Sequence, residues 1–173
     1  MTEQVILVDI EDNVLGTMDK MDAHVHGKLH RAFSVFIFNK AGELLLQQRA
    51  IDKYHSGGKW TNTCCSHPRL GEETVDAAHR RLKEEMGMEC DLQYAFNFTY
   101  KAQLLGGIAE NEYDHVYFGV SDDLPIPDPL EVSAFKYISM EALSRDMQEN
   151  QDEYTEWLKI CFERVQHSIK RLL

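Results

Sequence analysis

The sequence is poor in cysteine and in positive charge. Four cysteines, Cys64, Cys65, Cys90 and Cys161, are too few and too scattered in 173 residues for a disulfide framework, and none form a CxxC pair. Lys and Arg number 18 against 29 Asp and Glu, which gives a formal net charge of −11. An acidic protein has no general attraction for nucleic acid or anionic membranes. Anionic ligands must therefore be drawn by local basic residues or by metal ions.

The sequence also lacks any apolar run long enough to span a membrane. Residues 1–13 lack the basic segment, apolar run and small-residue cleavage site of a secretory signal. We therefore expect a cytoplasmic protein with reduced thiols, no membrane or nucleic-acid partner, and a monomeric or weakly dimeric state. A hydrophobic content of 43% over this length predicts one domain, residues 1–173, with a substantial core.

Hydrophobic patterning predicts a mixed sheet with helices packed on it, an α/β (α+β) fold. We expect strands at residues 5–9, 14–18, 32–38, 43–48, 93–101, 110–120 and 135–138. The segment 32–38 is apolar on both faces, which is typical of a central strand covered on both sides. Helices are expected up to Gly87, from Ser139 to about Met147, and from about Thr155 onwards. Residues 20–30 have no clear period and predict a loop or a short helix.

The most informative stretch is residues 60–87, which combines a thiol, an imidazole and a row of carboxylates in one loop and helix. In a helix Glu85 lies one turn from Arg81. The acidic side chains of this segment could converge on a divalent cation, because such cations prefer carboxylate oxygens. The pattern resembles the Nudix signature, with Ser66 in place of the opening glycine and Arg81 in place of a glutamate. The competing interpretation is an ordinary amphipathic helix with a solvated charged face.

A second acidic pattern lies in the strand expected at 110–120. Alternation places Glu110, Glu112 and Asp114 on one face, which continues into Val116 and Phe118. An inward-facing carboxylate needs a metal, a partner or a proton. An edge strand with solvated acids is the alternative, but the apolar continuation favours a ligand-binding role.

Three histidines could complete such a site: His24, His30 and His67. Three imidazoles and two carboxylates suit a first-row divalent metal, and the residues alone do not choose among manganese, zinc and magnesium. A single histidine is more often a surface or core residue than a ligand. For that reason five others are assigned no role: His26, His55, His79, His115 and His167.

Four separated strings, KMDAHVHGKLHRAFSVFIFN, LLQQRAIDKY, GKWTNTCCSHPRLGE and GIAENEYDHVYF, occur in this order along nearly the whole chain. Together they resemble the type 1 isopentenyl-diphosphate delta-isomerase family of the Nudix superfamily. The resemblance implies a Nudix-type mixed sheet sandwiched by helices, with an N-terminal extension and a C-terminal helix. It also implies reversible conversion of a small-molecule isoprenyl diphosphate, isopentenyl diphosphate, into dimethylallyl diphosphate.

The resemblance implies a role for individual residues. Cys65 matches the catalytic thiol, with Cys64 as a packing neighbour, and Glu112 matches the catalytic carboxylate. Glu85 matches a second-metal position, where Mg²⁺ bridges to the substrate diphosphate. The ligands of the tightly bound metal, Mn²⁺ or Zn²⁺, correspond to His24, His30, His67, Glu110 and Glu112. The basic residues around the diphosphate correspond to Lys20, Arg49, Lys53 and Arg81.

The chemistry of this isomerisation agrees with these residue types. The double bond must accept a proton at one end, and a proton must be lost from the other side of the allylic unit, so two acid/base groups must face this unit. We expect a thiol with a lowered pKa and a metal-bound carboxyl in a water-excluding site. Trp157 could stabilise the cationic intermediate through its π face, although it also belongs to the apolar stripe of the last helix. Tyr100 could hydrogen-bond Glu112 across neighbouring strands.

Arg81 favours an isomerase over a hydrolase, because an arginine binds diphosphate and removes a metal ligand needed for water attack. Hydrolysis of a nucleoside or prenyl diphosphate remains the alternative activity. A non-catalytic metal- or diphosphate-binding module is a third possibility, but it gives Cys65 no purpose. The extra histidine at position 26 leaves open whether His26 replaces His24 as a ligand.

Overall fold

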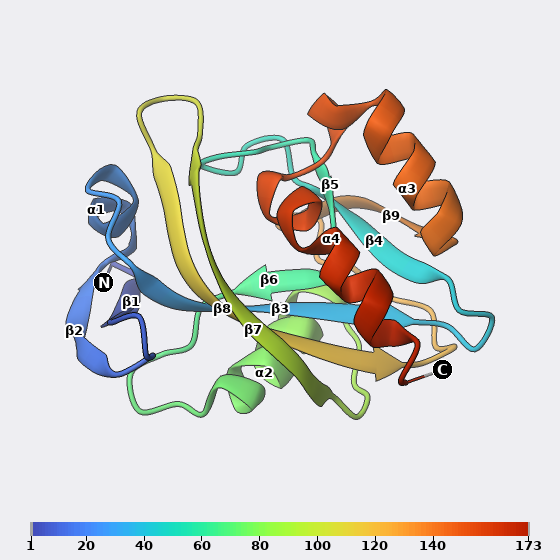
Figure 1. Ribbon diagram of the computed structural model, residues 1–173, viewed down its shortest axis with the longest axis horizontal. Helices are drawn as coiled ribbons and strands as arrows, with labels where there is room; N and C mark the ends of the chain where they lie inside the picture. Colours follow the sequence, from blue (N-terminus) through green and yellow to red (C-terminus); the bar gives the residue numbers. More distant parts are fainter. Residues whose placement is uncertain (1, 173) are drawn as a thin grey trace.

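The computed structural model of the chain describes residues 2–172, which form one mixed sheet with helices on both faces (Figure 1). The strands are β1 Gln4–Val8, β2 Val14–Asp19, β3 His30–Phe38, β4 Leu44–Arg49, β5 Trp60–Thr61, β6 Cys64–Ser66, β7 Gln93–Gln103, β8 Ala109–Val120 and β9 Val132–Ile138. The helices are α1 Lys20–Val25, α2 Thr74–Met86, α3 Met140–Glu149 and α4 Glu156–Ile169, with a 3₁₀ turn at Gln151–Glu153.

Strand β3 lies at the centre of the sheet and pairs with four other strands. It runs parallel to β8, with His30 opposite Glu112 and Phe38 opposite Val120. It is antiparallel to β6, where Ser34 lies opposite Cys65. The remaining partners, β1 and β4, are also antiparallel. The apolar run at 32–38 is therefore a central strand, as its sequence predicts.

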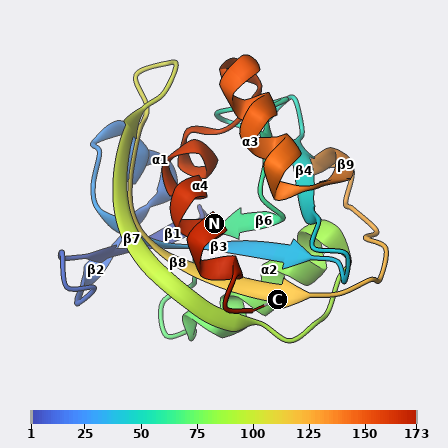
Figure 2. The same cartoon turned by 45° about the vertical axis from the view of Figure 1, so that its right-hand side comes forward.

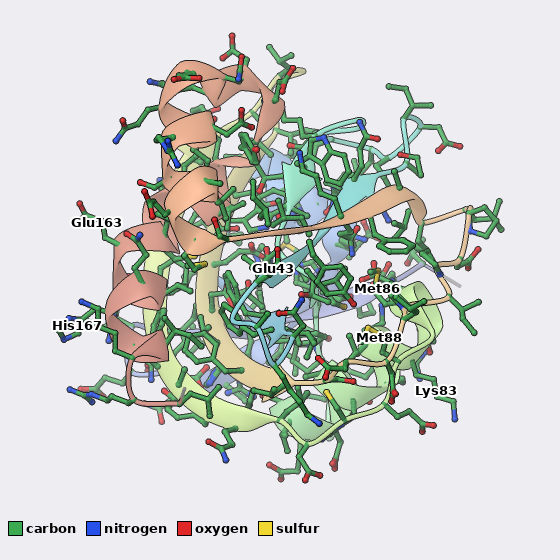
Figure 3. The ribbon with its side chains drawn as sticks, turned by 90° about the vertical axis from the view of Figure 1, so that its right-hand side faces the viewer. Glu43, Lys83, Met86, Met88, Glu163 and His167 are labelled. Carbon is green, nitrogen blue, oxygen red and sulfur yellow. The ribbon has the colours of Figure 1, made fainter. Side chains whose placement is uncertain are left out.

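The two faces of β3 enter two separate hydrophobic cores. Phe36 and Phe38 point to the side covered by α3 and α4, where Leu158 is fully buried. Val35 and Ile37 point to the other side, which α2 covers (Figure 2). Figure 3 shows this sandwich from the side: Met86 and Met88 lie within the α2 core, whereas Glu163 and His167 lie on the exposed face of α4. The predicted sheet sandwiched by helices is thus confirmed.

Helix α2 ends where its sequence predicts, because Gly87 adopts a left-handed conformation with φ of 63°. A Cβ atom at Gly87 would lie 2.6 Å from the carbonyl oxygen of Ile126. The connector between β8 and β9, residues 121–131, therefore packs directly against this turn. The amides of Ile126 and Asp128 donate to the carbonyls of Met86 and Glu85. These bonds place the connector beside α2.

Other boundaries differ from the sequence-based expectation. The short strands β5 and β6 are not apparent from the sequence, because strands of two and three residues are defined by their pairing with β4 and β3 rather than by alternation. Residues 20–25 form a short helix, one of the two predicted alternatives, with Asp19 accepting hydrogen bonds from the amides of Met21 and Asp22. No helix among residues 2–172 is long and apolar enough to cross a membrane.

Candidate active site

A cavity of about 670 Å³ opens between the start of α1, the loop that follows β4, the middle of α2 and the inner face of β8. The cavity collects residues that are far apart in the sequence. Ten of the residues singled out from the sequence line it: Lys20, Arg49, Lys53, Cys65, His67, Arg81, Glu85, Glu110, Glu112 and Trp157. Three more, His24, His30 and Tyr100, are buried near its wall.

The acidic face of β8 points inward, as its alternation predicts. Glu110, Glu112 and Asp114 are 2%, 7% and 2% exposed. The parallel register of β3 and β8 sets His30 beside Glu112, and the antiparallel register of β7 and β8 sets Tyr100 opposite Glu112. The Tyr100 hydroxyl donates a hydrogen bond to Glu112 Oε1, which confirms the predicted pairing.

Three imidazoles surround these two glutamates. His24 Nε2 lies 3.1 Å from Glu110 Oε1, and His67 Nε2 lies 2.8 Å from Glu112 Oε2. His30 Nε2 lies 3.3 Å from Glu112 Oε2. The Nδ1 atoms of His24 and His30 bond to the carbonyls of Lys20 and Lys28, so both rings direct Nε2 into the cluster.

The donor set fits a divalent cation. Ligand atoms from His24, His30 and His67 lie within 4.8 Å of one another, as do those from His30, Glu110 and Glu112. His30 Nε2 and Glu110 Oε2 are buried and have no hydrogen-bond partner. Buried polar atoms are rarely left without a partner, and imidazole with carboxylate is a common ligand set for first-row metals. The cluster is therefore a candidate metal centre.

The pKa values in the cluster follow from its ion pairs. Burial opposes the charge of Glu112, but its contacts with the imidazoles of His30 and His67 hold its pKa well below the ordinary value. Burial likewise opposes the charge of His24 and His30, but Glu110 and Glu112 raise their pKa above the ordinary value. Burial lowers the pKa of His67. Without a metal, pairing with the glutamates favours the imidazolium form of His24 and His30, whereas burial favours neutral His67.

Cys65 lies on the cavity wall among polar neighbours. Its Sγ accepts a hydrogen bond from Trp157 Nε1 at 3.1 Å and donates to Asn62 Oδ1 at 3.0 Å. Burial, and secondly the charge of Asp114, raise the pKa of Cys65 to about 12. The expectation of a lowered pKa is wrong, because no cation contacts the sulfur and a buried carboxyl lies nearby. The group available at neutral pH is the protonated thiol.

Cys64 points away from Cys65 into the α2 core. It is fully buried, and its Sγ donates to Glu85 Oε2 at 2.8 Å. Adjacent residues of a strand face opposite sides, so a single cysteine of the pair can reach the cavity. Burial raises the pKa of Glu85 despite the opposing charge of Arg81.

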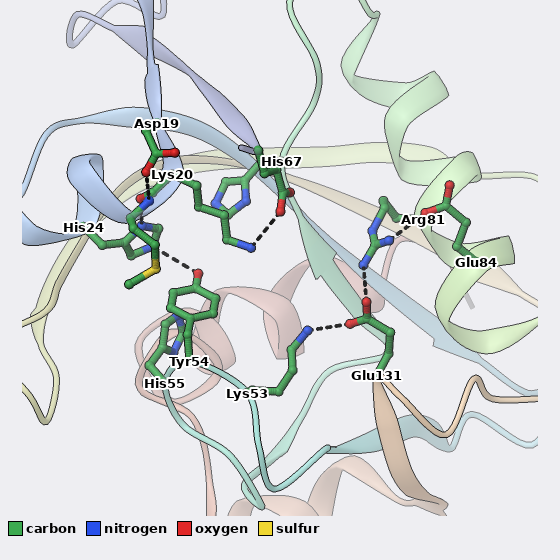
Figure 4. A network of polar contacts seen from close by, with 12 residues as sticks. Asp19, Lys20, His24, Lys53, Tyr54, His55, His67, Arg81, Glu84 and Glu131 are labelled. Atoms are coloured by element: carbon green, nitrogen blue, oxygen red, sulfur yellow. Dashed lines mark hydrogen bonds and ion pairs between the residues drawn. The ribbon is translucent and has the colours of Figure 1, made fainter. Parts of the chain in front are cut away.

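Three of the basic residues around the cavity, Lys20, Lys53 and Arg81, are paired with carboxylates (Figure 4). Arg81 contacts Glu84 at 2.6 Å and Glu85 at 3.2 Å, and both Arg81 and Lys53 contact Glu131 of the connector. The Glu84 and Glu85 contacts match the helical spacing, whereas the Glu131 contact links positions 50 residues apart in the sequence. Removal of the Glu131 charge would leave Lys53 without its carboxylate partner, whereas Arg81 would keep Glu84 and Glu85.

Arg49 occupies a more buried position than the other cations. It is 8% exposed, donates to the carbonyl oxygen of His55, and lies with its guanidinium carbon 5.2 Å from the Trp157 ring centroid. Lys20 lies at the other side of the cavity, 3.1 Å from Glu3. The predicted basic residues are thus distributed around the cavity rather than gathered at one point.

Two histidines differ from their sequence-based assignment. His26 is exposed and lies outside the cluster, so His24 is the histidine of this segment that reaches the glutamates. His55, to which the sequence assigns no role, is buried with Nε2 2.7 Å from Glu110 Oε1. Asn62 and Ser34 also have no distinguishing sequence signal. The pairing of β3 with β6 brings Ser34 to Cys65, whereas Asn62 meets the thiol within the turn that precedes β6.

Solved structures with the same fold define the class. The fold matches a Deinococcus radiodurans protein with a TM-score of 0.79 at 20% identity, covering 94% of this chain and 98% of that one. It matches a MutT protein from Methanosarcina mazei with a TM-score of 0.67 at 17% identity, covering 82% and 96%. The NUDIX domain family model matches residues 28–158. The fold and the carboxylate-bearing helix are those of a Nudix-domain protein.

Sequence relatives are more specific. Proteins named isopentenyl-diphosphate Delta-isomerase from Pectobacterium atrosepticum and Serratia proteamaculans are 52% and 48% identical to this chain. The first alignment covers 94% of this chain and 90% of the relative, and the second covers 91% and 88%. The chain belongs to the isopentenyl-diphosphate Delta-isomerase family, as the sequence motifs predict.

Proposed function

We propose that this protein interconverts isopentenyl diphosphate and dimethylallyl diphosphate, with Cys65 and Glu112 as the two acid/base groups. The observation that carries the proposal is that the Cys65 thiol and the Glu112 carboxylate, which accepts a hydrogen bond from Tyr100, line one cavity. Family membership gives the substrate class, since the relatives are named for isopentenyl diphosphate.

The reaction needs one proton gained and one lost. Protonation of the terminal CH₂ carbon of the double bond gives a tertiary cation, and removal of a proton from the carbon next to the CH₂–O group gives the isomeric double bond. No electrons are exchanged with a cofactor and no other bond breaks. One of Cys65 and Glu112 donates while the other accepts, and the roles exchange in the reverse direction.

The chain's own residues can hold these protons. Tyr100 and the imidazole of His67 hold the two oxygens of Glu112 in fixed positions. Trp157 and Asn62 hold the sulfur of Cys65 between a donor and an acceptor. A carbocation would be quenched by water, so the limited exposure of Glu112, which is buried, and of Cys65, which is half-buried, is part of the proposed mechanism.

Trp157 combines two roles that its sequence position leaves open. It is 4% exposed on the buried face of α4, and it also lines the cavity beside Cys65. Its N–H edge contacts the thiol, and its π face would stabilise positive charge on a five-carbon chain bound in the cavity. The Trp157 side chain therefore belongs both to the hydrophobic core and to the cavity wall.

Metal ions have two proposed places. His24, His30, His67, Glu110 and Glu112 would hold Mn²⁺ or Zn²⁺, and Glu85 would share Mg²⁺ with the substrate diphosphate. A bound cation would supply Lewis-acid charge that orients and polarises its carboxylate ligands. Lys20, Arg49, Lys53 and Arg81 would hold the diphosphate through charge-assisted hydrogen bonds.

The position of Arg81 supports isomerisation over Nudix hydrolysis. Its guanidinium contacts the carboxylates of Glu84, Glu85 and Glu131, where a glutamate would add another metal ligand. A cation at this position would anchor the diphosphate without helping to activate water.

Incubation with isopentenyl diphosphate in deuterated water tests the proposal. We expect dimethylallyl diphosphate that carries deuterium, because protons on both acid/base groups exchange with solvent. Release of phosphate or of an alcohol would indicate a hydrolase. Binding without turnover, measured by calorimetry beside the same assay, would indicate a non-catalytic module.

A further inference from the structure

A fourth imidazole lies at the edge of the candidate metal centre. His55, in the loop between β4 and β5, has its Nε2 2.7 Å from Glu110 Oε1, close enough to pair with that carboxylate. His24, His55 and Glu110 offer ligand atoms within 4.8 Å of one another. Figure 4 shows the His55 side chain beside Tyr54 at the cavity.

The loop that carries His55 is closed by its own bonds. Arg49 donates from its side chain to the His55 carbonyl oxygen at 3.2 Å, and its carbonyl oxygen accepts from the amide of Gly58 at 2.9 Å. A Cβ atom at Gly57 would lie 2.3 Å from the carbonyl oxygen of Ile51, so the turn can close this tightly only around a glycine. The backbone of the loop therefore sets the position of His55.

Packing also restricts the ring. The His55 ring meets Tyr54 edge-on with centroids 4.2 Å apart and meets Trp157 edge-on at 5.7 Å. The side chain is 4% exposed. A buried imidazole held between two aromatic rings cannot turn away from Glu110 without moving one of them.

The two partners of the His55–Glu110 contact determine which atom carries the proton. A glutamate carboxylate only accepts hydrogen bonds, so at 2.7 Å the Nε2 of His55 must carry the hydrogen. Nδ1 is then the acceptor nitrogen, and the Ser56 hydroxyl lies 3.1 Å from it. Glu110 Oε1 is thus held by a donor, while Glu110 Oε2 is buried without a partner.

His24 also contacts Glu110 Oε1, but it cannot keep this role once a metal is bound. An imidazole that ligates through Nε2 has no proton there to donate. The Nδ1 of His24 already bonds to the carbonyl oxygen of Lys20, which leaves Nε2 as the ligating atom. Within residues 2–172, His55 is then the side chain still placed to donate to Glu110 Oε1.

We propose that His55 is a positioning residue of the metal centre, which donates Nε2–H to Glu110 Oε1 and so leaves Glu110 Oε2 directed at the cation. The inference rests on the metal site of the proposed function but not on turnover. Residues that hold a metal ligand in place typically contribute about 10- to 100-fold to metal affinity. We expect a loss of that size when the N–H donor is removed.

The test compares dissociation constants of metal-stripped proteins for Mn²⁺ and for Zn²⁺, measured by competition with a chromophoric chelator. His55→Ala should bind each ion about 10- to 100-fold more weakly than the unmodified chain. His55→Gln, whose amide N–H can replace Nε2–H, should recover most of the affinity. His26→Ala removes an exposed imidazole from the neighbouring segment and should bind as the unmodified chain does.

Three other results would each contradict the proposal. Unchanged affinity in His55→Ala would remove His55 from the metal centre. Affinity as weak in His55→Gln as in His55→Ala would show that His55 ligates the metal directly rather than holding Glu110. Absence of binding by the unmodified chain would refute the proposed metal site itself. Thermal melting of the metal-free variants identifies any that fail to fold.

Discussion

At the scale of single residues, the site depends on two adjacent cysteines with opposite surroundings. Cys65 Sγ lies at the cavity between Trp157 and Asn62, whereas Cys64 Sγ is buried under α2 against Glu85. Both thiols have raised pKa values because burial disfavours the thiolate. The difference between them is therefore access to the cavity rather than acidity.

This difference gives a matched pair of substitutions. Cys65→Ala should lower kcat for isopentenyl diphosphate by about 100- to 10,000-fold, the usual contribution of one acid/base group. Cys64→Ala deletes the same atom one position away and should retain most of the activity, with a stability loss of about 1 kcal/mol from the lost bond to Glu85. Substantial turnover by Cys65→Ala, with folding verified by circular dichroism, would exclude the thiol from the reaction.

At the scale of elements, hydrogen bonds connect the start of α4 to residues 61–62, which precede the thiol of Cys65 in the chain. Thr155, the residue before the helix, donates from its hydroxyl to Thr61, and Thr61 donates to Asn62 Oδ1, the same oxygen that accepts from Cys65. All three of these polar residues are 1% exposed or less. Together with Trp157, this chain of hydrogen bonds ties the start of α4 to the thiol.

Thr155→Val keeps the side-chain shape but removes the hydroxyl. We expect a stability loss of about 1 kcal/mol, together with a lower kcat because Asn62 loses an oriented neighbour. Thr155→Ser should restore both. Ser139→Ala removes a helix cap far from the cavity and should cost about 1 kcal/mol of stability with kcat unchanged. Equal kcat in Thr155→Val and Ser139→Ala, measured under saturating substrate, would refute the coupling.

At the scale of the whole molecule, the candidate metal centre joins parts of the chain that are distant in sequence. Its ligands come from α1, from the start of β3, from the loop after β6 and from β8. A ligand that binds only the folded state stabilises it by mass action. Metal occupancy should therefore control the stability of the entire sheet.

Addition of metal at about 1,000 times its dissociation constant should stabilise the protein by about 4 kcal/mol. For a domain of this size that corresponds to a rise in Tm of about 8 °C or more over the chelator-treated protein, measured by calorimetry. The rise should shrink as the pH falls through the raised pKa values of His24 and His30, because both must lose a proton to bind. A Tm rise that does not depend on pH would contradict histidine ligation.

In the metal-free protein, the contribution of these histidines to folding stability falls as the pH rises, which is opposite to the pH dependence of metal binding. Their folded pKa values lie above the unfolded ones, so their ion pairs stabilise the fold at low pH and are lost as the pH rises through the folded pKa. Glu110 and Glu112 have lowered pKa values, and their contribution is lost as the pH falls through them. Metal-free stability should accordingly be greatest between these two limits.

The sequence by itself determined features that depend on local pattern. Alternation along residues 110–120 placed Glu110 and Glu112 on the buried face, and the left-handed preference of glycine ended α2 at Gly87. The spacing of four motifs identified the family without any coordinates. Such features depend only on neighbouring residues and can therefore be predicted from the sequence.

Tertiary structure decided which side chains meet. The turn around Gly57 brings His55 to Glu110, the pairing of β3 with β6 surrounds the thiol, and the connector carries Glu131 to Arg81. None of these contacts has a period or a spacing in the sequence, because each joins segments whose separation is bridged only when the sheet forms. The elevated pKa of Cys65 arises for the same reason, since burial is a property of the assembled fold.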